Sequence, residues 1–178
     1  TFVYYFSKKT VVRAILNECD RGGQVYFVDN CVKSLLIVLA WLRKSLPQLV
    51  FGVVYSALPD KKLLTTMSLF VKNKINVLLS TSIIESGIDL GRVNTIIINN
   101  AHLFGLSQLY QLRGRVGRSS LLASAFLLLP KKEGLSLLAT KRLRAFLKFT
   151  SLGSGYQLAL EDLDLRGAGS VFGYQQSG

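Results

Sequence analysis

The run Gln24-Val-Tyr-Phe-Val28 is almost continuously apolar, and it contains two β-branched and two aromatic side chains. Side chains of a strand point alternately to its two faces, so this run predicts a strand that is buried on both faces. Strands of that kind are typical of parallel sheets covered by helices. Arg21-Gly-Gly23 comes directly before the run and has the composition of a helix end. We therefore expect a helix, a sharp stop and then a buried parallel strand.

The chain up to residue 130 alternates between strand-like and helix-like patterns. Val12, Ile15 and Leu16, for example, recur at the spacing of one helix face. Six strands with intervening helices predict an α/β fold, with an open, mainly parallel sheet and helices on both faces. In such sheets the ligand site lies beyond the carboxyl ends of the strands. The predicted strands are Phe2 to Phe6, Gln24 to Val28, Leu49 to Tyr55, Asn76 to Ser80, Val93 to Ile98 and Ser124 to Leu129, and the predicted helices are Lys9 to Cys19, Val32 to Leu46, Leu63 to Val71 and Ser107 to Leu112.

The composition favours a polyanionic partner. The chain has 22 Lys and Arg against 10 Asp and Glu, so its net charge is +12, and cations of this number bind nucleic acid by releasing its counterions. Hydrophobic residues make up 49% of the chain, which is more than solubility requires, and we expect a neighbouring domain to cover some apolar surface. The chain opens on Thr1, and we interpret it as a segment of a longer protein.

Several classes of protein are not expected. Cys19 and Cys31 are too far apart for a metal-binding pair, and His102 is the single histidine, so neither a metal site nor a Ser-His-Asp triad is predicted. The cysteines fit reduced thiols in a cytoplasmic protein. The apolar run from Leu35 to Leu42 is well short of the roughly 20 residues that span a bilayer, so no membrane partner is expected.

A cluster of arginines is the strongest chemical signal. Arg113, Arg115 and Arg118 lie within six residues, together with Gly114 and Gly117. Guanidinium groups match phosphate oxygens, and glycines allow the backbone to approach a ligand closely. A solvated basic turn is the alternative interpretation.

This cluster and a stretch upstream of it, from Ile75 to Leu90, resemble motifs VI and V of superfamily-2 helicases. The resemblance implies the second of two RecA-like motor lobes, which supplies arginine fingers to an ATP held mainly by the first. Ser56 stands in Tyr55-Ser-Ala57, where the family commonly has Gly-His-Gly. The implied roles are catalysis for Arg115 and Arg118, nucleotide binding for Gly87, Asp89, Gln111 and Gly114, and DNA binding for Thr81 and Ser56.

Lys131-Lys-Glu-Gly134 is the predicted boundary between a lobe of residues 1–130 and a region of residues 131–178. The second region resembles the translocation motif shared by RecG and the transcription-repair coupling factor family (Mfd), a helical hairpin and loop that couples ATP hydrolysis to movement. The resemblance places coupling residues at Arg142, Arg166 and Gln176. An ordinary amphipathic helix pair is the alternative. The run Arg21 to Asn30 resembles the coupling factor family more closely than RecG.

The expected function is that of the C-terminal motor lobe of an ATP-dependent double-stranded DNA translocase, which displaces stalled RNA polymerase and acts with nucleotide-excision-repair proteins. The chain contains no GxxxxGK[ST] loop and no Asp-Glu box, so we expect ATP and Mg²⁺ to be held mainly by the first lobe. This segment alone should not hydrolyse ATP. The alternatives are a RecG-type branch-migrating helicase, a nucleic-acid-binding module without motor activity, and an interaction scaffold.

Overall fold

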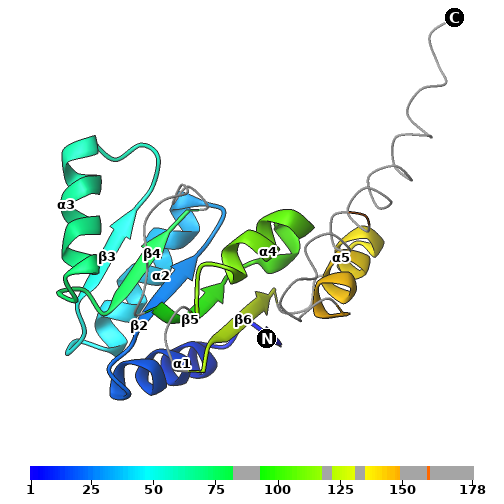
Figure 1. Ribbon diagram of the computed structural model, residues 1–178, viewed down its shortest axis with the longest axis horizontal. Helices are drawn as coiled ribbons and strands as arrows, with labels where there is room; N and C mark the ends of the chain where they lie inside the picture. Colours follow the sequence, from blue (N-terminus) through cyan, green and yellow to red (C-terminus); the bar gives the residue numbers. More distant parts are fainter. Residues whose placement is uncertain (82–92, 118–121, 131–134, 149–159, 161–178) are drawn as a thin grey trace, which may run out of the picture.

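The computed structural model of the 178-residue chain describes residues 1–81, 93–117, 122–130, 135–148 and 160 (Figure 1). Six strands form one sheet in the order β1-β6-β5-β2-β4-β3, and all five strand pairs are parallel. The predicted α/β sheet is therefore confirmed. The strands are β1 (Phe2–Tyr5), β2 (Gln24–Val28), β3 (Phe51–Val54), β4 (Val77–Ser80), β5 (Val93–Ile98) and β6 (Ser124–Leu129).

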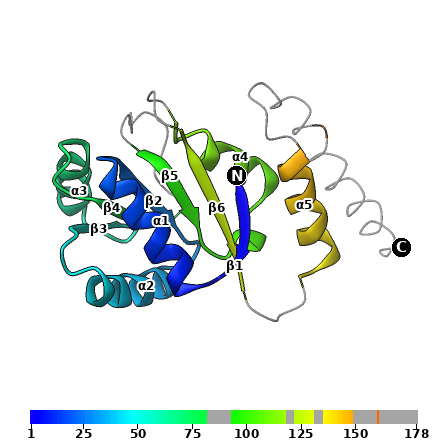
Figure 2. The ribbon, with the colours of Figure 1, turned by 90° about the horizontal axis from the view of Figure 1, so that it is seen from below.

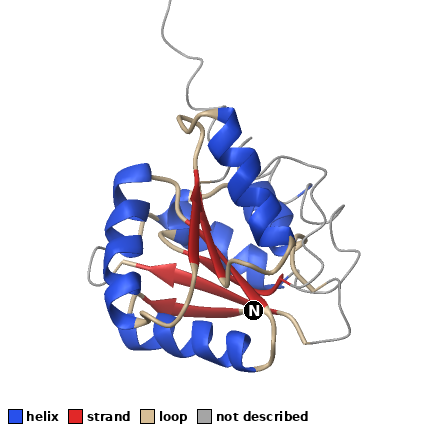
Figure 3. Ribbon diagram, turned by 90° about the vertical axis from the view of Figure 1, so that its left-hand side faces the viewer, coloured by secondary structure: helices blue, strands red, loops and turns tan. Residues whose placement is uncertain are grey.

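Strand β2 is buried along its whole length, as its apolar run predicts. Tyr26 and Val28 belong to the core on one face of the sheet, whereas Val25 and Phe27 belong to the core on the other. The core around Val25 and Phe27 also contains side chains of helices α1 (Lys8–Asp20) and α2 (Val32–Ser45). The core around Tyr26 and Val28 also contains side chains of α3 (Asp60–Val71), η1 (Ala101–Leu103), α4 (Leu106–Arg113) and α5 (Leu137–Lys148). Figures 2 and 3 show helices on both sides of the sheet.

The end of α1 forms as the sequence predicts. Gly22 has a φ of +81°, a conformation that favours glycine, and its N–H donates to the Cys19 carbonyl at 2.9 Å. Helix α3 begins three residues earlier than the predicted Leu63. The Pro59 carbonyl accepts hydrogen bonds from the N–H groups of Lys62 and Leu63 at 2.9 and 3.1 Å, and its ring holds the φ angle near the helical value. The proline therefore lies at the start of the helix.

Helix α5 packs beside α4 (Figures 1 and 2). Its Leu143, Ala145 and Phe146 are buried in the same core as the sheet residues of β5 and β6. The first described helix after the predicted boundary at residue 131 thus shares a core with the lobe. The boundary itself and the helical hairpin and loop stay predictions, since residues 149–159 and 161–178 lie outside the described part of the chain. None of the described helices has the length and hydropathy to cross a membrane.

Candidate functional site

The described candidate residues lie at two opposite ends of the strands. Ser56 follows β3 and Thr81 follows β4, so both are at the carboxyl end of the sheet. Helix α4 starts after β5 and runs back, and the turn that follows it reaches the first residue of β5: the Gly117 N–H donates to the Val93 carbonyl at 3.2 Å. We call residues 113–117 the arginine turn. Contrary to the expectation for parallel sheets, this part of the predicted site lies at the amino end, because α4 runs antiparallel to the strands.

The arginine turn continues α4 as a tight, hydrogen-bonded loop. The Arg115 N–H donates to the Leu112 carbonyl at 3.1 Å, and the Gly114 N–H donates to the Tyr110 carbonyl at 3.0 Å. Gly117 has a φ of +85°, and a Cβ atom at this position would lie only 2.7 Å from the Cβ atom of Ala123. The close return of the chain therefore requires a glycine here.

Arg115 lies within electrostatic range of the face of the sheet. Burial raises the pKa of Tyr26 to about 12, whereas a hydrogen bond with Ser80 and the positive charge of Arg115 both act to lower it. The Tyr26 hydroxyl and the Ser80 Oγ are 3.1 Å apart. Arg115 is half-buried, while Gln111 and Gly114 are exposed. A guanidinium held beside exposed backbone in this way suits an anionic ligand that arrives from outside the lobe.

Arg113 has a different environment from the one its place in the arginine cluster suggests. Its guanidinium carbon lies 5.2 Å from the centre of the Tyr110 ring and 5.5 Å from the centre of the Phe146 ring. Cations over aromatic faces are attracted by the electrons of the ring. Arg113 therefore joins α4 to α5, a role that could not be predicted because Phe146 is distant in the sequence.

Thr81 is buried at the carboxyl end of β4, with 6% of its surface exposed. Its N–H donates to the Val54 carbonyl at 3.3 Å, whereas its hydroxyl has no hydrogen-bond partner among the described residues. A buried hydroxyl without a partner costs about 1–3 kcal/mol. This hydroxyl is therefore available to a ligand. Ser56 is exposed in the turn after β3, where the Leu58 N–H donates to the Tyr55 carbonyl at 3.0 Å.

A buried carboxylate that the sequence motifs did not single out lies at the same end. Asp29 is fully buried directly after β2. Its side chain accepts hydrogen bonds from the Cys31 N–H at 3.1 Å, the Ser34 hydroxyl at 2.7 Å and the Asn99 amide at 2.7 Å, while its own N–H donates to the Ser80 carbonyl at 3.0 Å. These bonds hold the ends of β2, β4 and β5 together beside Thr81. In the sequence, the only indication of this cluster is that polar residues directly follow the apolar strands.

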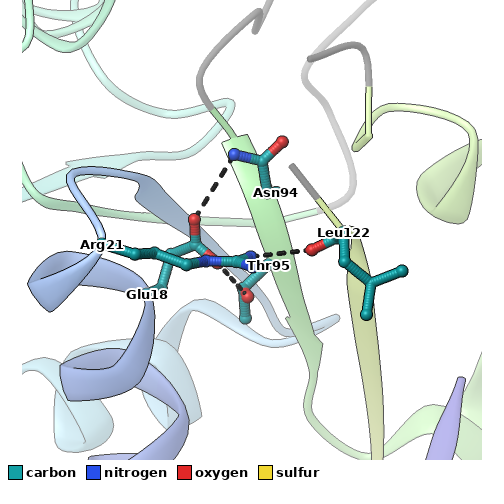
Figure 4. Close-up of polar contacts among 5 residues, drawn as sticks. All are labelled: Glu18, Arg21, Asn94, Thr95 and Leu122. Atoms are coloured by element: carbon teal, nitrogen blue, oxygen red, sulfur yellow. Dashed lines mark hydrogen bonds and ion pairs between the residues drawn. The ribbon is translucent and has the colours of Figure 1, made fainter. Parts of the chain in front are cut away.

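A second buried carboxylate lies at the amino end of β5 (Figure 4). Glu18, from the last turn of α1, accepts hydrogen bonds from Arg21, Thr95 and Asn94. Arg21 also donates from Nη2 to the carbonyl oxygen of Leu122 at 2.9 Å. The ion pair thus links α1 to β5 and to the segment that enters β6. The sequence pattern assigned Arg21 only to a helix end.

The remaining candidate residues lie on α5 or beyond the described ranges. Arg142 on α5 donates from Nη1 to the Phe104 carbonyl at 3.1 Å, and its buried Nε has no hydrogen-bond partner in the described part of the chain. Its neighbours are thus the residues that lead from η1 into α4. Gly87, Asp89, Arg118, Arg166 and Gln176 lie outside the described residues, so their roles stay predictions.

The chemistry of the donors in the arginine turn fits a phosphate group. Within the parts of the chain that the structure describes, no group of three or more His, Cys, Asp and Glu side chains is arranged to hold a metal. The arginine turn instead offers a charged guanidinium and exposed backbone. Guanidinium groups bind polyphosphates by charge-assisted hydrogen bonds.

Comparison with known proteins gives both a family and relatives. A family model described as the helicase conserved C-terminal domain matches residues 7–120. Over all 178 residues, the chain is 47% identical to a transcription-repair-coupling factor from Myxococcus xanthus, of which it covers 15%. It is likewise 44% identical to a chloroplastic ATP-dependent DNA helicase from Arabidopsis thaliana, of which it covers 22%. The chain therefore spans less than a quarter of the length of these relatives.

Solved structures agree with this result. RecG bound to a three-way DNA junction superposes with a TM-score of 0.77 and 32% identity, over 95% of this chain and 22% of that chain. Domain 2 of the DEAD-box helicase Mss116p, bound to an RNA duplex, superposes with a TM-score of 0.63 over 78% of this chain and 52% of that chain. At 17% identity the second likeness concerns the fold alone.

Proposed function

This chain belongs to the helicase conserved C-terminal domain family, and from that premise we propose that it is the second motor lobe of an ATP-dependent translocase acting on double-stranded DNA. The observation that carries the proposal is the arginine turn, which Gly117 anchors to the amino end of β5 in a chain 47% identical to a transcription-repair-coupling factor. A superfamily-2 motor requires such a turn, because its second lobe contributes positive charge to an ATP that the first lobe holds.

The proposed nucleotide end comprises the arginine turn and the residues that lead into β5. Arg115 and Arg118 would enter the cleft between the lobes and neutralise charge that develops on the transferring γ-phosphoryl group. Mg²⁺, bound mainly by the first lobe, would supply further charge neutralisation at the phosphates. The remaining nucleotide contacts are assigned to Gly87, Asp89, Gln111 and Gly114.

The proposed DNA end is the carboxyl end of the sheet. Thr81, with its unpartnered hydroxyl, and the exposed Ser56 are placed to contact the phosphates of one strand. Strand β5 has six residues and spans about 20 Å at roughly 3.3 Å per residue, so the backbone of the arginine turn is well separated from that of Thr81, although the positive charge of Arg115 reaches Tyr26. A rotation of the lobe that closes the nucleotide end therefore displaces the DNA end, which is what translocation requires.

The proposed coupling element starts at α5. Arg142 contacts the Phe104 carbonyl, and Phe146 contacts Arg113, so α5 is attached to both ends of α4. A change at the arginine turn would thereby reach α5, which precedes Arg166 and Gln176 in the sequence. We assign these two residues, with Arg142, to the coupling of ATP hydrolysis to movement.

The proposed partners are double-stranded DNA, an upstream RecA-like lobe of the same protein, RNA polymerase and nucleotide-excision-repair proteins. The names of the coupling-factor relatives, which refer to transcription and repair, support the last two. The proposed location is the cytoplasm. A RecG-type branch-migrating helicase is the second candidate function. The superposition on RecG, with 32% identity over 95% of the chain, favours it as a specific alternative.

Assays of the intact protein separate these functions. A coupling factor should hydrolyse ATP faster when duplex DNA is added, displace a triplex strand and release a stalled RNA polymerase. A RecG-type helicase should instead act most strongly on branched junctions and leave the stalled polymerase in place. ATP hydrolysis that does not respond to DNA of either kind would contradict the motor assignment.

A further inference from the structure

We propose that the free edge of β3 is a docking site for an extended, acidic segment of a separate partner protein. The site is a groove of about 630 Å³ along this strand, lined by residues of β3, α2 and α3. Strand β3 is the last strand of the sheet beyond β4, whereas the arginine turn is attached to β5. The inference therefore goes beyond the proposed function and does not depend on it.

The backbone of β3 has one side without a strand partner among the described residues. Figure 1 shows β3 at the end of the sheet, next to α3, and its only pairing there is with β4. The Val54 carbonyl accepts a hydrogen bond from the Thr81 N–H, in the direction of β4. Backbone groups alternate in direction along a strand, so those of Phe51 and Val53 point away from β4. Such an edge can bind an extended peptide through main-chain hydrogen bonds.

The floor of the groove is apolar. Its apolar side chains are Val50, Phe51, Val53, Leu58, Leu69 and Ile75. Val50 and Leu69 are 52% and 42% exposed, so a partner that covers them gains by removing apolar surface from water. Side chains of an extended peptide alternate between two faces. A segment with an apolar residue at every second position would therefore fill this floor.

The rim of the groove is positively charged. Arg43 and Lys74 lie toward the amino end of β3, and Lys61 and Lys62 lie toward its carboxyl end. All four side chains are exposed, and none forms an ion pair within the described part of the chain. The described lining contains no acidic residue. Complementary charges steer association and exclude like-charged partners, so the occupant that fits is acidic.

The hydroxyl groups in the groove favour a peptide over a nucleic acid. Thr65 and Thr66 donate to the carbonyls of Lys61 and Lys62 at 2.7 and 2.9 Å, within α3. These hydroxyls are therefore engaged and do not add to phosphate binding. A nucleic acid would meet cations above an apolar floor, and it lacks the alternating N–H and C=O groups that match a strand edge. A peptide supplies these groups and apolar side chains together.

The same cations indicate which kind of protein fits. Two copies of this lobe, paired edge to edge, would bring their positive charges together, which opposes pairing. Charged side chains beside an exposed edge also protect it from aggregation while it is vacant. An edge that stays soluble without its partner suits an association that forms and ends. A separate protein, rather than a permanently packed domain, meets this condition.

The test uses the intact protein and a fluorescein-labelled peptide with blocked termini that alternates Glu and Val. A length of about nine residues, roughly 30 Å when extended, exceeds the four residues of β3. We expect fluorescence anisotropy to show binding that weakens as salt is added. A peptide with Lys in place of Glu should bind at least about tenfold more weakly. No binding of the acidic peptide would overturn the inference, because the cations would then only protect the edge.

The double variant Arg43→Glu/Lys74→Glu tests the rim at the end of the groove away from Ser56. It should weaken binding of the acidic peptide by about tenfold or more and strengthen binding of the Lys peptide. The matched control is Lys33→Glu/Lys141→Glu, which has the same change in net charge at exposed positions outside the groove. The control should bind the acidic peptide within about twofold of wild type. Equal weakening in the two double variants would overturn the inference.

Two further peptides test the backbone contact on the unaltered protein, so this result does not depend on the folding of a variant. One carries N-methyl groups on its Val residues, and the other carries them on its Glu residues. Only every second residue of an added strand faces β3, so one peptide should lose binding and the other should keep it. Equal affinities of the two peptides would overturn the inference, since no strand would then be added.

The same variants identify the other possible occupants. If Arg43→Glu/Lys74→Glu lowers the affinity for duplex DNA more than the control does, the groove binds nucleic acid and the inference is wrong. If sedimentation velocity shows a dimer that this variant removes, the occupant is a second copy and the inference is again wrong. ATP hydrolysis that does not respond to DNA would contradict the proposed motor function but would leave the peptide results standing, so the two failures are distinguishable.

Discussion

The guanidinium carbon of Arg113 lies 5.5 Å from the centre of the Phe146 ring, so the last residue of α4 is held against α5. Phe146 is fully buried, and it belongs to the same core as the sheet. The cation therefore rests on a ring that the lobe keeps in position. This contact makes the packing of α5 part of the environment of the arginine turn.

Phe146→Leu should reveal the strength of that attachment. The change keeps an apolar side chain but removes the ring and leaves a gap, so we expect the free energy of unfolding to fall by about 1–3 kcal/mol. Urea denaturation measures it. Leu147→Ala, on the neighbouring and partly exposed position, is the control and should change stability by less than about 1 kcal/mol. Equal losses in the two variants would contradict the packing role of Phe146.

Arg118→Ala tests the finger in the intact protein. We expect DNA-stimulated ATP turnover to fall by about 10³-fold or more, because a charge on the transferring phosphoryl group loses its partner. Arg115→Ala should act in the same direction. Binding of a fluorescent ATP analogue should remain largely in place, and the exposed Arg144→Ala should behave as wild type. Turnover within a few-fold of wild type would rule out the assignment.

Thr81→Val should change DNA binding and stability in different directions. Valine removes a buried hydroxyl that has no partner, so we expect the free energy of unfolding to stay constant or rise. If the hydroxyl contacts a DNA phosphate, affinity should fall by roughly fivefold, which corresponds to about 1 kcal/mol. Fluorescence anisotropy over a salt series measures the affinity, which should be independent of DNA sequence and steeply dependent on salt.

Thr65→Val is the matched control for Thr81, since this exposed hydroxyl donates to the Lys61 carbonyl on α3. It should leave DNA affinity unchanged. Equal affinities of Thr81→Val and the wild type at every salt concentration would argue against a phosphate contact at Thr81, and a strong preference for one DNA sequence would argue against backbone recognition.

Tyr26 predicts a loss of stability in alkaline solution. Its pKa rises from 10.0 to about 12 in the folded protein, so between these values the unfolded chain loses the phenol proton first. The contribution of Tyr26 to the free energy of unfolding is therefore fully present below pH 10, and about 2–3 kcal/mol of it is lost as the pH approaches 12. Urea denaturation at pH 9 and pH 11 measures the change.

Tyr26→Phe isolates this effect from that of Cys19, whose pKa burial raises to about 11. The variant loses the hydrogen bond to Ser80, so it should be less stable at pH 9 but should show a smaller fall at pH 11. The same fall in both proteins would mean that Tyr26 does not titrate as the structure indicates.

Arg166→Ala and Gln176→Ala test the coupling assignment, which rests on the resemblance of the C-terminal region. Each variant of the intact protein should retain substantial ATP hydrolysis but fail to displace a triplex strand or a stalled RNA polymerase. The competing hypothesis of ordinary packing expects a lower melting temperature, with both activities falling together. Melting temperature, ATP turnover and triplex displacement on the same samples therefore separate the two.

The strands were predictable because their signal is local. All five residues of β2 are buried, and each of its side chains is apolar apart from Gln24, whose amide donates to the carbonyls of Phe70 and Ile75 at 2.8 and 2.7 Å. The end of α1 at Gly22 was predictable for the same reason. The start of α3 was missed, since proline is common both in turns and at the first positions of helices.

The polar networks were not predictable, because their members come from distant parts of the chain. The hydrogen bonds of Glu18 with Asn94 and Thr95, and that of Asp29 with Asn99, form only when β5 lies beside β2. The location of the arginine turn follows from the parallel sheet, because a helix that connects two parallel strands runs back to their amino ends. Motif resemblance identified candidate residues, but it did not indicate that they lie at opposite ends of the sheet.

The pairing of β1 with β6 has a consequence for the synthesis of the protein. Phe2 aligns with Phe126, so the first strand of this sheet to be synthesised waits for the last strand of the same sheet. At about 5–20 residues per second, this wait is on the order of 10 s. During that time Phe2, Tyr4 and Tyr5, which stay partly exposed even in the finished fold, present an unpaired aromatic edge. The nascent strand β1 is therefore the part of this sheet where a chaperone would have the longest opportunity to bind.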